Sequence, residues 1–363
     1  MLISPPRSPF ARLFKIMSTP NSDFRMTGLL DWLKTCPASL GLDPSTLVPA
    51  SSDASFRRYF RISAAAGTLV VMDAPPPQED CAPFIDVAHR LAEAGLNVPK
   101  ILAQDLSQGF LLLSDLGPTT YYDRIQAGVS DAKLQQMYRE ALAALVQMQT
   151  ANQEGLPQYD EARLTSELGL FLEWYVTVHC KVTLPPAALE RLDQVFNLLA
   201  KHNAAQPRVL VHRDFHSPNL MVCERPEHGQ NPGILDFQDA VSGPISYDLA
   251  SLVFDARTTW EEPQQLDWAI RYWELARKQG LPVAADFADF HRDYEWMGLQ
   301  RNLRILGVFA RLNHRDGKAA YLAHMPRVNQ YVRQVAGRYI AFKPLIRILD
   351  ELDQVQTKVG YTF

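Results

Sequence analysis

One segment of the chain, residues 209–222, does most to constrain its fold and its chemistry. The apolar residues 209–211 predict a short strand, a polar turn follows, and the apolar residues 220–222 predict a second strand. Within the turn, Asp214 and Asn219 stand five positions apart in the pattern His-x-Asp-x-x-x-x-Asn. Because a single loop between two strands carries both side chains, we expect them to converge on one point.

A third apolar run, residues 233–235, ends at a further carboxylate, Asp236. If this run pairs with the second strand, Asp236 comes close to Asn219. Oxygen ligands of this kind suit Mg²⁺, which takes its other ligands from water and substrate phosphates. Asp214, left free of the metal, can orient a hydroxyl group and accept its proton. The pattern therefore predicts a phosphoryl-transfer site that uses ATP and Mg²⁺.

A metallohydrolase is the alternative that these residues leave open. His212, Asp214 and His216 alternate, so on a continuing strand they would share one face, and His with Asp can bind a transition metal. Pro218 instead predicts a loop around His216. A hydrolase would also leave the segment that ends at Asp236 without a role. Each polar residue taken singly is as well explained by turn capping, so the prediction depends on the whole set.

Composition is that of an ordinary folded protein. The 363 residues suffice for two lobes with separate cores; 47% are hydrophobic and 21% charged. A net charge of −4 and a pI near 6.1 give no whole-chain argument for nucleic acid or a membrane surface. No apolar run approaches the ~20 residues that span a bilayer. The four cysteines lie far apart, which favours a reducing compartment. We therefore expect the protein to be located in the cytoplasm. We expect no obligate protein partner.

The expected fold class is α+β and bilobal, with a small β-rich N-lobe and a large helical C-lobe. Residues 1–26 lack the apolar stretch of a signal peptide, so we expect a disordered tail or a misassigned start, with Met17 and Met26 as alternative starts. We expect a hinge at 115–120, where glycine and proline interrupt the pattern. The N-lobe then covers residues 27–114 and the C-lobe residues 121–363.

Apolar periodicity predicts the elements of each lobe. In the N-lobe the pattern predicts a short helix at 27–34, a longer helix at 80–93, and strands at 59–63, 68–72, 98–103 and 109–114. In the C-lobe it predicts a helix capped by Ser130, helices near 161–178 and 187–202, the three short strands described above, and a mostly helical remainder from 248 to 355.

The central motif also resembles that of a known superfamily. The resemblance rests on His212-Arg213-Asp214-Phe215-His216-Ser217-Pro218-Asn219, on residues 234–240 and on residues 243–252. These are similar to the catalytic and metal-binding segments of the aminoglycoside phosphotransferase and choline kinase-like superfamily, over about residues 50–345. The resemblance implies a protein-kinase-like fold, ATP and Mg²⁺. It also implies that Asp248 is structural and ties a helix start to the catalytic loop.

A narrower resemblance involves residues 72–76, 111–117, 171–175 and 296–303. These segments are similar to the bacterial sugar kinases of cell-wall recycling, which phosphorylate N-acetylmuramate and N-acetylglucosamine at the anomeric hydroxyl with ATP. The residues alone predict only a kinase of a small hydroxylated molecule, and the sugar comes from the resemblance. Two alternatives stay open: a kinase of another small molecule, such as an aminoglycoside or an alcohol, and a pseudokinase that binds nucleotide without turnover.

In the implied mechanism Asp214 accepts or orients the proton of the anomeric hydroxyl, and Asn219 and Asp236 hold Mg²⁺ against the ATP phosphates. We expect His212 to brace the loop by hydrogen bonds rather than to contact substrate. Arg213 either stabilises the transferred charge or pairs with a local carboxylate.

The N-lobe departs from the wider kinase pattern. It has no Gly-x-Gly-x-x-Gly; the corresponding turn is 51–56, whose backbone amides could still bind phosphate. The strand that should carry a phosphate-binding lysine, 69–72, has none. Arginine binds phosphate well, so the candidates for the missing cation are Arg57, Arg58 and Arg61, with Arg58 facing opposite to the other two. Glu79 or Glu93 could hold such a cation, and backbone groups of Leu113, Ser114 and Leu116 would bind adenine.

An acetamido sugar that bears a lactyl carboxylate needs an aromatic face, amide partners and a cation. The candidates for the face and its polar partners are Glu173, Trp174 and Tyr175. Arg301 and Arg304 are three positions apart on a predicted helix and, with Arg311, could meet the carboxylate. Basic residues at such spacing also occur on solvated helix faces. An arginine face favours an acidic sugar over a polycationic aminoglycoside.

Overall fold

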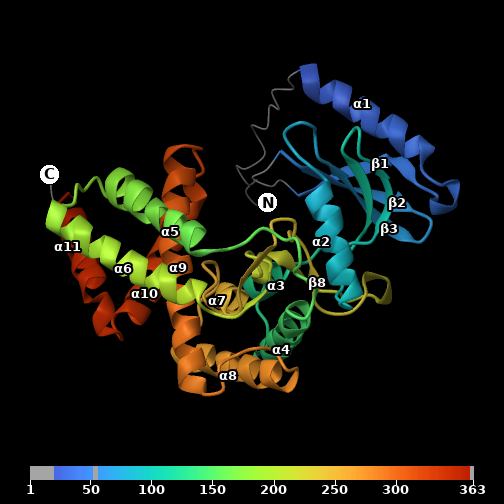
Figure 1. Cartoon of the computed structure of the whole chain (residues 1–363). Coiled ribbons are helices and arrows are strands. Elements are labelled where there is room, and N and C mark those ends of the chain that lie inside the picture. Colours follow the sequence, from blue (N-terminus) through green and yellow to red (C-terminus); the bar gives the residue numbers. More distant parts are fainter. Residues whose placement is uncertain (1–19, 52–55, 360–363) are drawn as a thin grey trace, which may run out of the picture. The chain divides into compact units, whose positions relative to one another are not determined.

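The computed structural model describes residues 20–51 and 56–359, which form two compact units (Figure 1). The first unit comprises the described residues up to Cys81 together with Ile101–Asp115. The second comprises Ala82–Lys100 and the chain from Leu116 onward. The main division, between Asp115 and Leu116, falls inside the segment predicted as a hinge.

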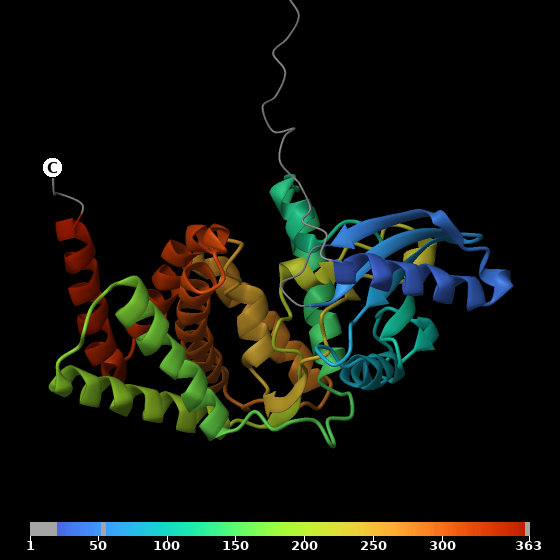
Figure 2. The same ribbon diagram turned by 90° about the horizontal axis from the view of Figure 1, so that it is seen from above.

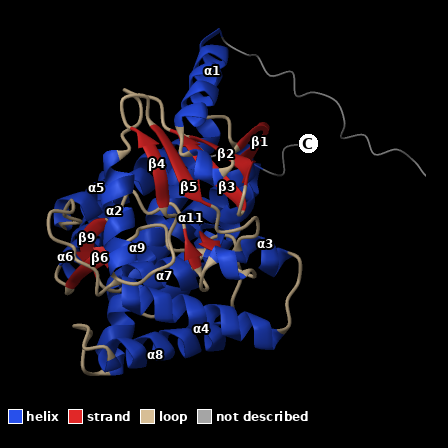
Figure 3. Ribbon diagram, turned by 90° about the vertical axis from the view of Figure 1, so that its right-hand side faces the viewer, coloured by secondary structure: helices blue, strands red, loops and turns tan. Residues whose placement is uncertain are grey.

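The first unit is a five-stranded antiparallel sheet in the order β1-β2-β3-β5-β4. Figure 3 shows its strands side by side. Their bounds are Asp43–Ser51 (β1), Arg58–Ala64 (β2), Gly67–Asp73 (β3), Ile101–Asp105 (β4) and Phe110–Ser114 (β5). The predicted hairpin between the second and third strands is confirmed, and it closes at the pair Ala64 and Gly67. The sequence did not predict β1, because Pro44 and Pro49 interrupt its pattern.

One face of this sheet packs against α1, Pro20–Thr35, which is longer than the helix predicted at 27–34. Because side chains alternate along a strand, Phe60 and Ile62 of β2 point to the same face. They join a buried cluster with Trp32 of α1 and Val71 of β3. Polar and charged residues at alternate positions, such as Arg61, are directed to the opposite face.

Helix α2, Ala82–Glu93, groups with the second unit, whereas the sequence assigned its residues to the N-lobe. Its buried residue Phe84 packs against Phe237, with ring centroids 4.9 Å apart. Arg90 donates hydrogen bonds to the carbonyl oxygens of Asn152 (2.9 Å) and Glu154 (2.8 Å). These contacts, between residues far apart in sequence, explain why periodicity alone did not show where the helix packs.

The second unit is mainly helical. Its α-helices are α3 (Tyr121–Gln126), α4 (Asp131–Met148), α5 (Glu161–Leu170), α6 (Pro186–Ala204), α7 (Tyr247–Val253), α8 (Glu262–Lys278), α9 (Phe287–His314), α10 (Met325–Ala336) and α11 (Lys343–Val359). The Ser130 hydroxyl caps α4 as predicted, accepting a hydrogen bond from the Lys133 amide. Figure 2 shows α11 (red) against α6 (yellow-green). Among the described residues, no helix is long and apolar enough to cross a membrane.

Two short antiparallel pairs are inserted among these helices. β6 (Arg208–Val211) pairs with β9 (Val241–Pro244), and β7 (Leu220–Met221) pairs with β8 (Gly233–Ile234). The three strands predicted around the central motif are confirmed, and β9 is the one the sequence missed. The loop between β6 and β7 is thus held by a strand pair on each side.

The helix predicted at 161–178 is α-helical only to Leu170 and continues as a π-helix over Phe171–His179. Gly307 of α9 lies against this junction: a Cβ atom there would be 2.3 Å from the carbonyl oxygen of Leu170. The absence of a side chain lets α9 cross close to α5. The close crossing sets Arg304 of α9 beside Glu167 of α5.

Candidate active site

The catalytic loop, residues 212–219, lies between β6 and β7, and hydrogen bonds join its start to the first turn of α7. The amides of His212 and Arg213 donate hydrogen bonds to the two carboxylate oxygens of Asp248, at 2.7 and 3.0 Å. Asp248 is fully buried, and burial raises its pKa to about 7 even though both amides favour the charged form. This geometry matches the structural role that the resemblance implied for Asp248.

Both ring nitrogens of His212 are used inside the loop. Nε2 lies 2.9 Å from the carbonyl oxygen of Leu235, so it must donate, and Nδ1 accepts a hydrogen bond from the Asp214 amide at 3.3 Å. Burial lowers the pKa of His212 to about 4, which fits this neutral ring. His212 therefore braces the loop against the segment that leads to Asp236.

Asn219 connects Asp214 with Asp236. Its Nδ2 donates to the carbonyl oxygen of Asp214 at 2.9 Å and to Oδ2 of Asp236 at 3.2 Å. The backbone carbonyl oxygen of Asn219 accepts a hydrogen bond from the Leu235 amide at 2.9 Å. Gln238 donates to the other carboxylate oxygen of Asp236 at 2.8 Å. The structure thus brings together the three polar residues that the motif singled out.

Asp214 is an ionised carboxylate. Burial by itself would raise its pKa, but electrostatic interactions with His216, Arg304 and Arg301 outweigh burial and lower the pKa to about 2. An ionised side chain at this position can accept a hydrogen bond, and then a proton, from a hydroxyl group. This is the property that a general base of phosphoryl transfer needs.

The donor set fits Mg²⁺ better than a transition metal. The side-chain oxygens of Asn219 and Asp236 are hard ligands, and the hydrogen bonds above hold the two residues together. The metallohydrolase alternative needs His212 as a ligand, yet both of its nitrogens are engaged. Among the described residues, no group of three or more His, Cys, Asp or Glu side chains could hold a metal ion.

The arginines of α9 are not a solvated face. Arg301 is 3% exposed, and within the described part of the chain its Nε and Nη1 have no hydrogen-bond partner. Nε of Arg304 lies 3.1 Å from Oε2 of Glu167, and Arg213 donates to Oε1 of the same carboxylate at 2.9 Å. Arg311 lies about two helical turns beyond Arg304 and is only partly buried. Sequence analysis missed Glu167, because an isolated glutamate on a helix carries no signal of what it meets.

Asp255 is a second residue that the motif did not reveal. It is fully buried, and its Oδ2 accepts hydrogen bonds from the amide (3.1 Å) and the hydroxyl of Ser217. Its Oδ1 lies 3.9 Å from Nδ1 of His216. Burial alone would raise the pKa of Asp255, but the contacts with His216 and Ser217 lower it. Asp255 therefore holds the second half of the catalytic loop as an anion.

The proposed sugar-binding trio divides in the structure. Glu173 is exposed, Trp174 is half-buried, and Tyr175 is buried. The Tyr175 ring stacks on those of Phe171 and His179, and its described contacts do not include the catalytic loop. Consecutive residues of a helix point in different directions, so the three side chains do not form one surface.

In the first unit each candidate phosphate-binding arginine meets a carboxylate. Arg57 pairs with Glu79 at 2.9 Å, and Glu93, the other candidate partner, is exposed. The remaining pairs are Arg58 with Asp73, a carboxylate shared with Arg25, and Arg61 with Asp115 at 2.6 Å. Residues 52–55, most of the predicted phosphate-binding turn, lie outside the described residues.

The predicted adenine-binding residues fall at the boundary of the two units. Leu113 and Ser114 end β5, where they pair with Val70 and Leu69 of β3. Leu116 begins the second unit, and its carbonyl oxygen lies 3.7 Å from the thiol of Cys223.

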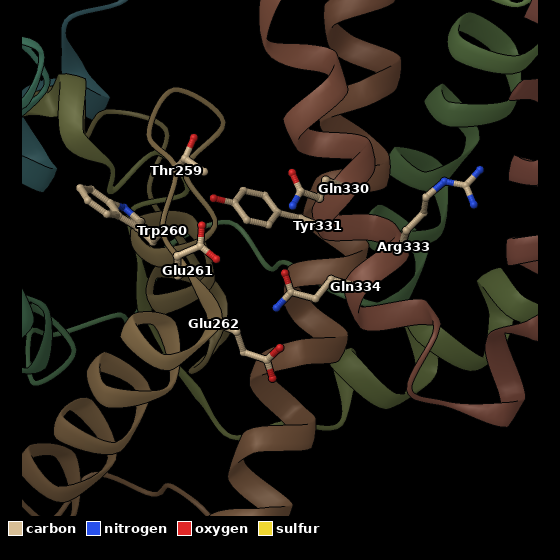
Figure 4. Close-up of a pocket in the computed structure, with 8 residues that line it drawn as sticks. All are labelled: Thr259, Trp260, Glu261, Glu262, Gln330, Tyr331, Arg333 and Gln334. Carbon is tan, nitrogen blue, oxygen red and sulfur yellow. The ribbon is translucent and has the colours of Figure 1, made fainter. Parts of the chain in front are cut away.

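A pocket of about 470 Å³ lies elsewhere on the second unit (Figure 4). It is lined by Thr259, Trp260, Glu261, Glu262, Gln330, Tyr331, Arg333 and Gln334. None of these residues belongs to the catalytic loop. The pocket is therefore not the candidate active site.

An antiparallel sheet in one unit, and a helical unit with a braced Asp–Asn–Asp loop, define a protein-kinase-like phosphotransferase. The model of the phosphotransferase enzyme family matches residues 46–295. The chain belongs to this family and is an enzyme that transfers phosphoryl groups.

Relatives at high identity cover nearly the whole chain. An N-acetylmuramate/N-acetylglucosamine kinase of Pseudomonas aeruginosa is 46% identical to this chain, and the alignment covers 92% of this chain and 98% of the relative. A protein of the same name from Neisseria meningitidis is 42% identical, with 93% and 99% covered.

Solved structures at low identity share the fold. A choline/ethanolamine kinase family protein from Mesorhizobium loti has a TM-score of 0.58 at 14% identity, covering 89% of this chain and 98% of its own. A spectinomycin phosphotransferase in complex with ADP and spectinomycin also has a TM-score of 0.58, at 12% identity, with 88% and 98% covered. The bilobal protein-kinase-like fold expected from the sequence is confirmed.

Proposed function

We propose that this enzyme transfers the γ-phosphoryl group of ATP to the anomeric hydroxyl of N-acetylmuramate and N-acetylglucosamine, in the cytoplasm, giving the sugar 1-phosphate. The observation that carries the proposal is the name shared by relatives that are 42–46% identical over 92–93% of the chain. The ionised Asp214 in its braced loop supports the same chemistry.

In this mechanism Asp214 receives the sugar. Its carboxylate accepts a hydrogen bond from the anomeric hydroxyl, directs that oxygen at the γ-phosphorus, and takes its proton as the new oxygen–phosphorus bond forms. The bond between the γ-phosphorus and the oxygen that bridges to the β-phosphate breaks, and ADP leaves with that oxygen. The amides that Asp248 holds keep the loop in place while this happens. His212, neutral and fully hydrogen-bonded, takes no part in proton transfer.

Asn219 and Asp236 would hold Mg²⁺. The bound ion would neutralise charge on the ATP phosphates. The hydrogen bond from Gln238 and the one from Asn219 fix the Asp236 carboxylate for this task.

Arg301 is the better candidate for the lactyl carboxylate of N-acetylmuramate. Arg304 forms an ion pair with Glu167, whereas among the described residues Nε and Nη1 of Arg301 have neither a hydrogen-bond partner nor an ion pair. A buried guanidinium with unmet donors gains most from a carboxylate ligand. Trp174 remains the proposed aromatic contact, with Glu173 as a polar partner; the packing of Tyr175 among other rings argues against a direct role for it.

For ATP, Arg57 is the proposed phosphate ligand of the first unit. It directly follows the turn 51–56, and Glu79 holds its guanidinium as a glutamate holds the lysine in protein kinases. Glu79 also accepts a hydrogen bond from the Phe56 amide at 3.2 Å. We propose that backbone groups of residues 113–116 bind adenine, as in the wider superfamily.

The test measures ATP consumption by the wild type and by the Arg301→Leu variant with each of three acceptors: N-acetylmuramate, N-acetylglucosamine and an aminoglycoside. We expect turnover of both sugars, and a product that releases phosphate in mild acid because it is an anomeric ester. Arg301→Leu should raise the KM for N-acetylmuramate on the order of tenfold and that for N-acetylglucosamine less, because only the former carries a carboxylate.

Turnover of the aminoglycoside alone would replace the proposal with the second kinase hypothesis. ATP binding without turnover of any acceptor would favour a pseudokinase, for which the absence of a lysine in β3 is the supporting observation.

A further inference from the structure

Glu167, near the end of α5, joins two parts of the second unit. Its side chain is 12% exposed. Oε1 accepts a hydrogen bond from Nη2 of Arg213 at 2.9 Å, and Oε2 lies 3.1 Å from Nε of Arg304. The hydroxyl of Tyr159 also donates to Oε2. A single carboxylate thereby connects the catalytic loop with α9.

Arg213 has an unusual backbone conformation. Its φ is 76°, in the left-handed region that side chains other than glycine rarely adopt. The next residue in the chain is Asp214. The Arg213 side chain is held by Glu167 and lies over the Tyr159 ring, with 5.6 Å between the guanidinium carbon and the ring centroid. These contacts stabilise a strained conformation at the residue that precedes the general base.

Arg304 acts on Asp214 through its charge. Burial by itself would lower the pKa of Arg304, but Tyr247 and Glu167 outweigh burial and raise it, so the guanidinium stays charged. The charges of Arg304 and Asp214 attract each other. Without Glu167, the two guanidinium groups would lose the carboxylate that both of them contact.

We propose that Glu167 is a positioning residue for phosphoryl transfer, which holds Arg213 and Arg304 in place beside Asp214. Glu167 acts through these arginines and does not itself touch the sugar or ATP. The proposal rests on the proposed function, because Asp214 is the general base there. It goes beyond that function in assigning a catalytic consequence to a carboxylate outside the loop motif.

Glu295 of α9 provides a matched control. It is 2% exposed, pairs with Arg338, and accepts a hydrogen bond from the Tyr339 hydroxyl at 2.7 Å. Its described contacts do not include the catalytic loop. Glu167→Gln and Glu295→Gln therefore remove the same charge from similar Arg–Glu–Tyr clusters, and only the first cluster adjoins Asp214.

The experiment measures kcat, the KM for ATP and thermal stability for both variants and for Glu167→Asp. Since misplacement of a reacting group by about 1 Å can cost on the order of 10²-fold, we expect Glu167→Gln to lower kcat by about tenfold to hundredfold. The KM for ATP should stay within about twofold, because no ATP contact is lost. Glu167→Asp, which keeps the charge, should recover most of the lost kcat. Glu295→Gln should lower the melting temperature and leave kcat near that of the wild type.

Two results would overturn the proposal: a kcat for Glu167→Gln within about twofold of the wild type, or an equal fall in kcat for Glu295→Gln at equal loss of stability. The slow transfer of phosphoryl groups from ATP to water, measured without sugar, separates this test from that of the proposed function. If the wild type turns over neither sugar, the proposed function fails. The ratio of wild-type to Glu167→Gln rates for transfer to water would still support or refute the role of Glu167.

Discussion

The catalytic loop of the second unit and the arginines of the first unit are organised differently. In the loop, hydrogen bonds from the Asn219 side chain join Asp214 and Asp236. Two strand pairs, β6 with β9 and β7 with β8, hold the loop from either side. In the sheet, Arg58 and Arg61 each pair with a carboxylate from a distant position, Asp73 and Asp115. The loop therefore directs its polar groups toward one point, whereas the sheet distributes its arginines over separate partners.

This difference shows why a local motif is a better guide to chemistry than a cluster of like charges. The hydrogen bonds of the loop motif join residues that the motif itself contains. Three arginines within five positions have several possible sets of partners, because side chains alternate between the two faces of β2 and each guanidinium can pair with a different carboxylate. Arg57 differs from the other two, because its partner Glu79 also accepts a hydrogen bond from the amide of Phe56, the last residue of the predicted phosphate-binding turn.

The largest expected effect is in the loop. Asp214→Asn keeps the size of the side chain but cannot accept the proton of the hydroxyl, so we expect kcat to fall by about 10³-fold. The KM for ATP and the melting temperature should change little. Steady-state kinetics and thermal unfolding check this. A kcat within about tenfold of the wild type would show that the loop does not supply the general base.

The next effect concerns stability and pH. The pKa of His212 is about 4 in the folded protein and about 6.5 when unfolded, so the unfolded chain takes up the proton first as the pH falls. The free energy of unfolding should therefore decrease between pH 6.5 and 4, by about 2 kcal/mol on reaching pH 5. His212→Gln keeps a donor for the Leu235 carbonyl and cannot titrate. Urea unfolding at pH 7 and at pH 5 measures the free energy of unfolding. Its decrease between these two pH values should be larger in the wild type than in the variant by the contribution of His212. An equal decrease in both proteins would contradict a buried neutral ring.

The smallest expected effect tests the sheet. Arg57→Ala should raise the KM for ATP by about tenfold, the value of one charge-assisted hydrogen bond to phosphate. Arg25→Ala is the matched control: it removes an ion pair to Asp73 in the same unit, and we expect lower stability with an unchanged KM. If Arg57→Ala behaves as the control does, the phosphate-binding cation lies elsewhere, and Arg61 becomes the candidate.

Most of the fold was predictable because its signals are periodic and local. The hairpin between β2 and β3, the Ser130 cap of α4 and the strands around the loop follow from alternation, capping and turn residues. The assignment of α2 to the second unit was not predictable, since it depends on contacts with residues such as Asn152 and Phe237. Nor was the change to a π-helix after Leu170, which lies where Gly307 lets α9 come close.

By itself the sequence determined which polar residues meet at the loop, because Asp214, Asn219 and Asp236 lie on short segments next to paired strands. Only the tertiary structure decided what surrounds it. Glu167 meets Arg213 across 46 positions of the chain, and Arg61 meets Asp115 across 54. The physical reason is that an ion pair depends on distance in space, which the packing of elements far apart in the sequence sets, whereas a turn and its hydrogen bonds are set by neighbours along the chain.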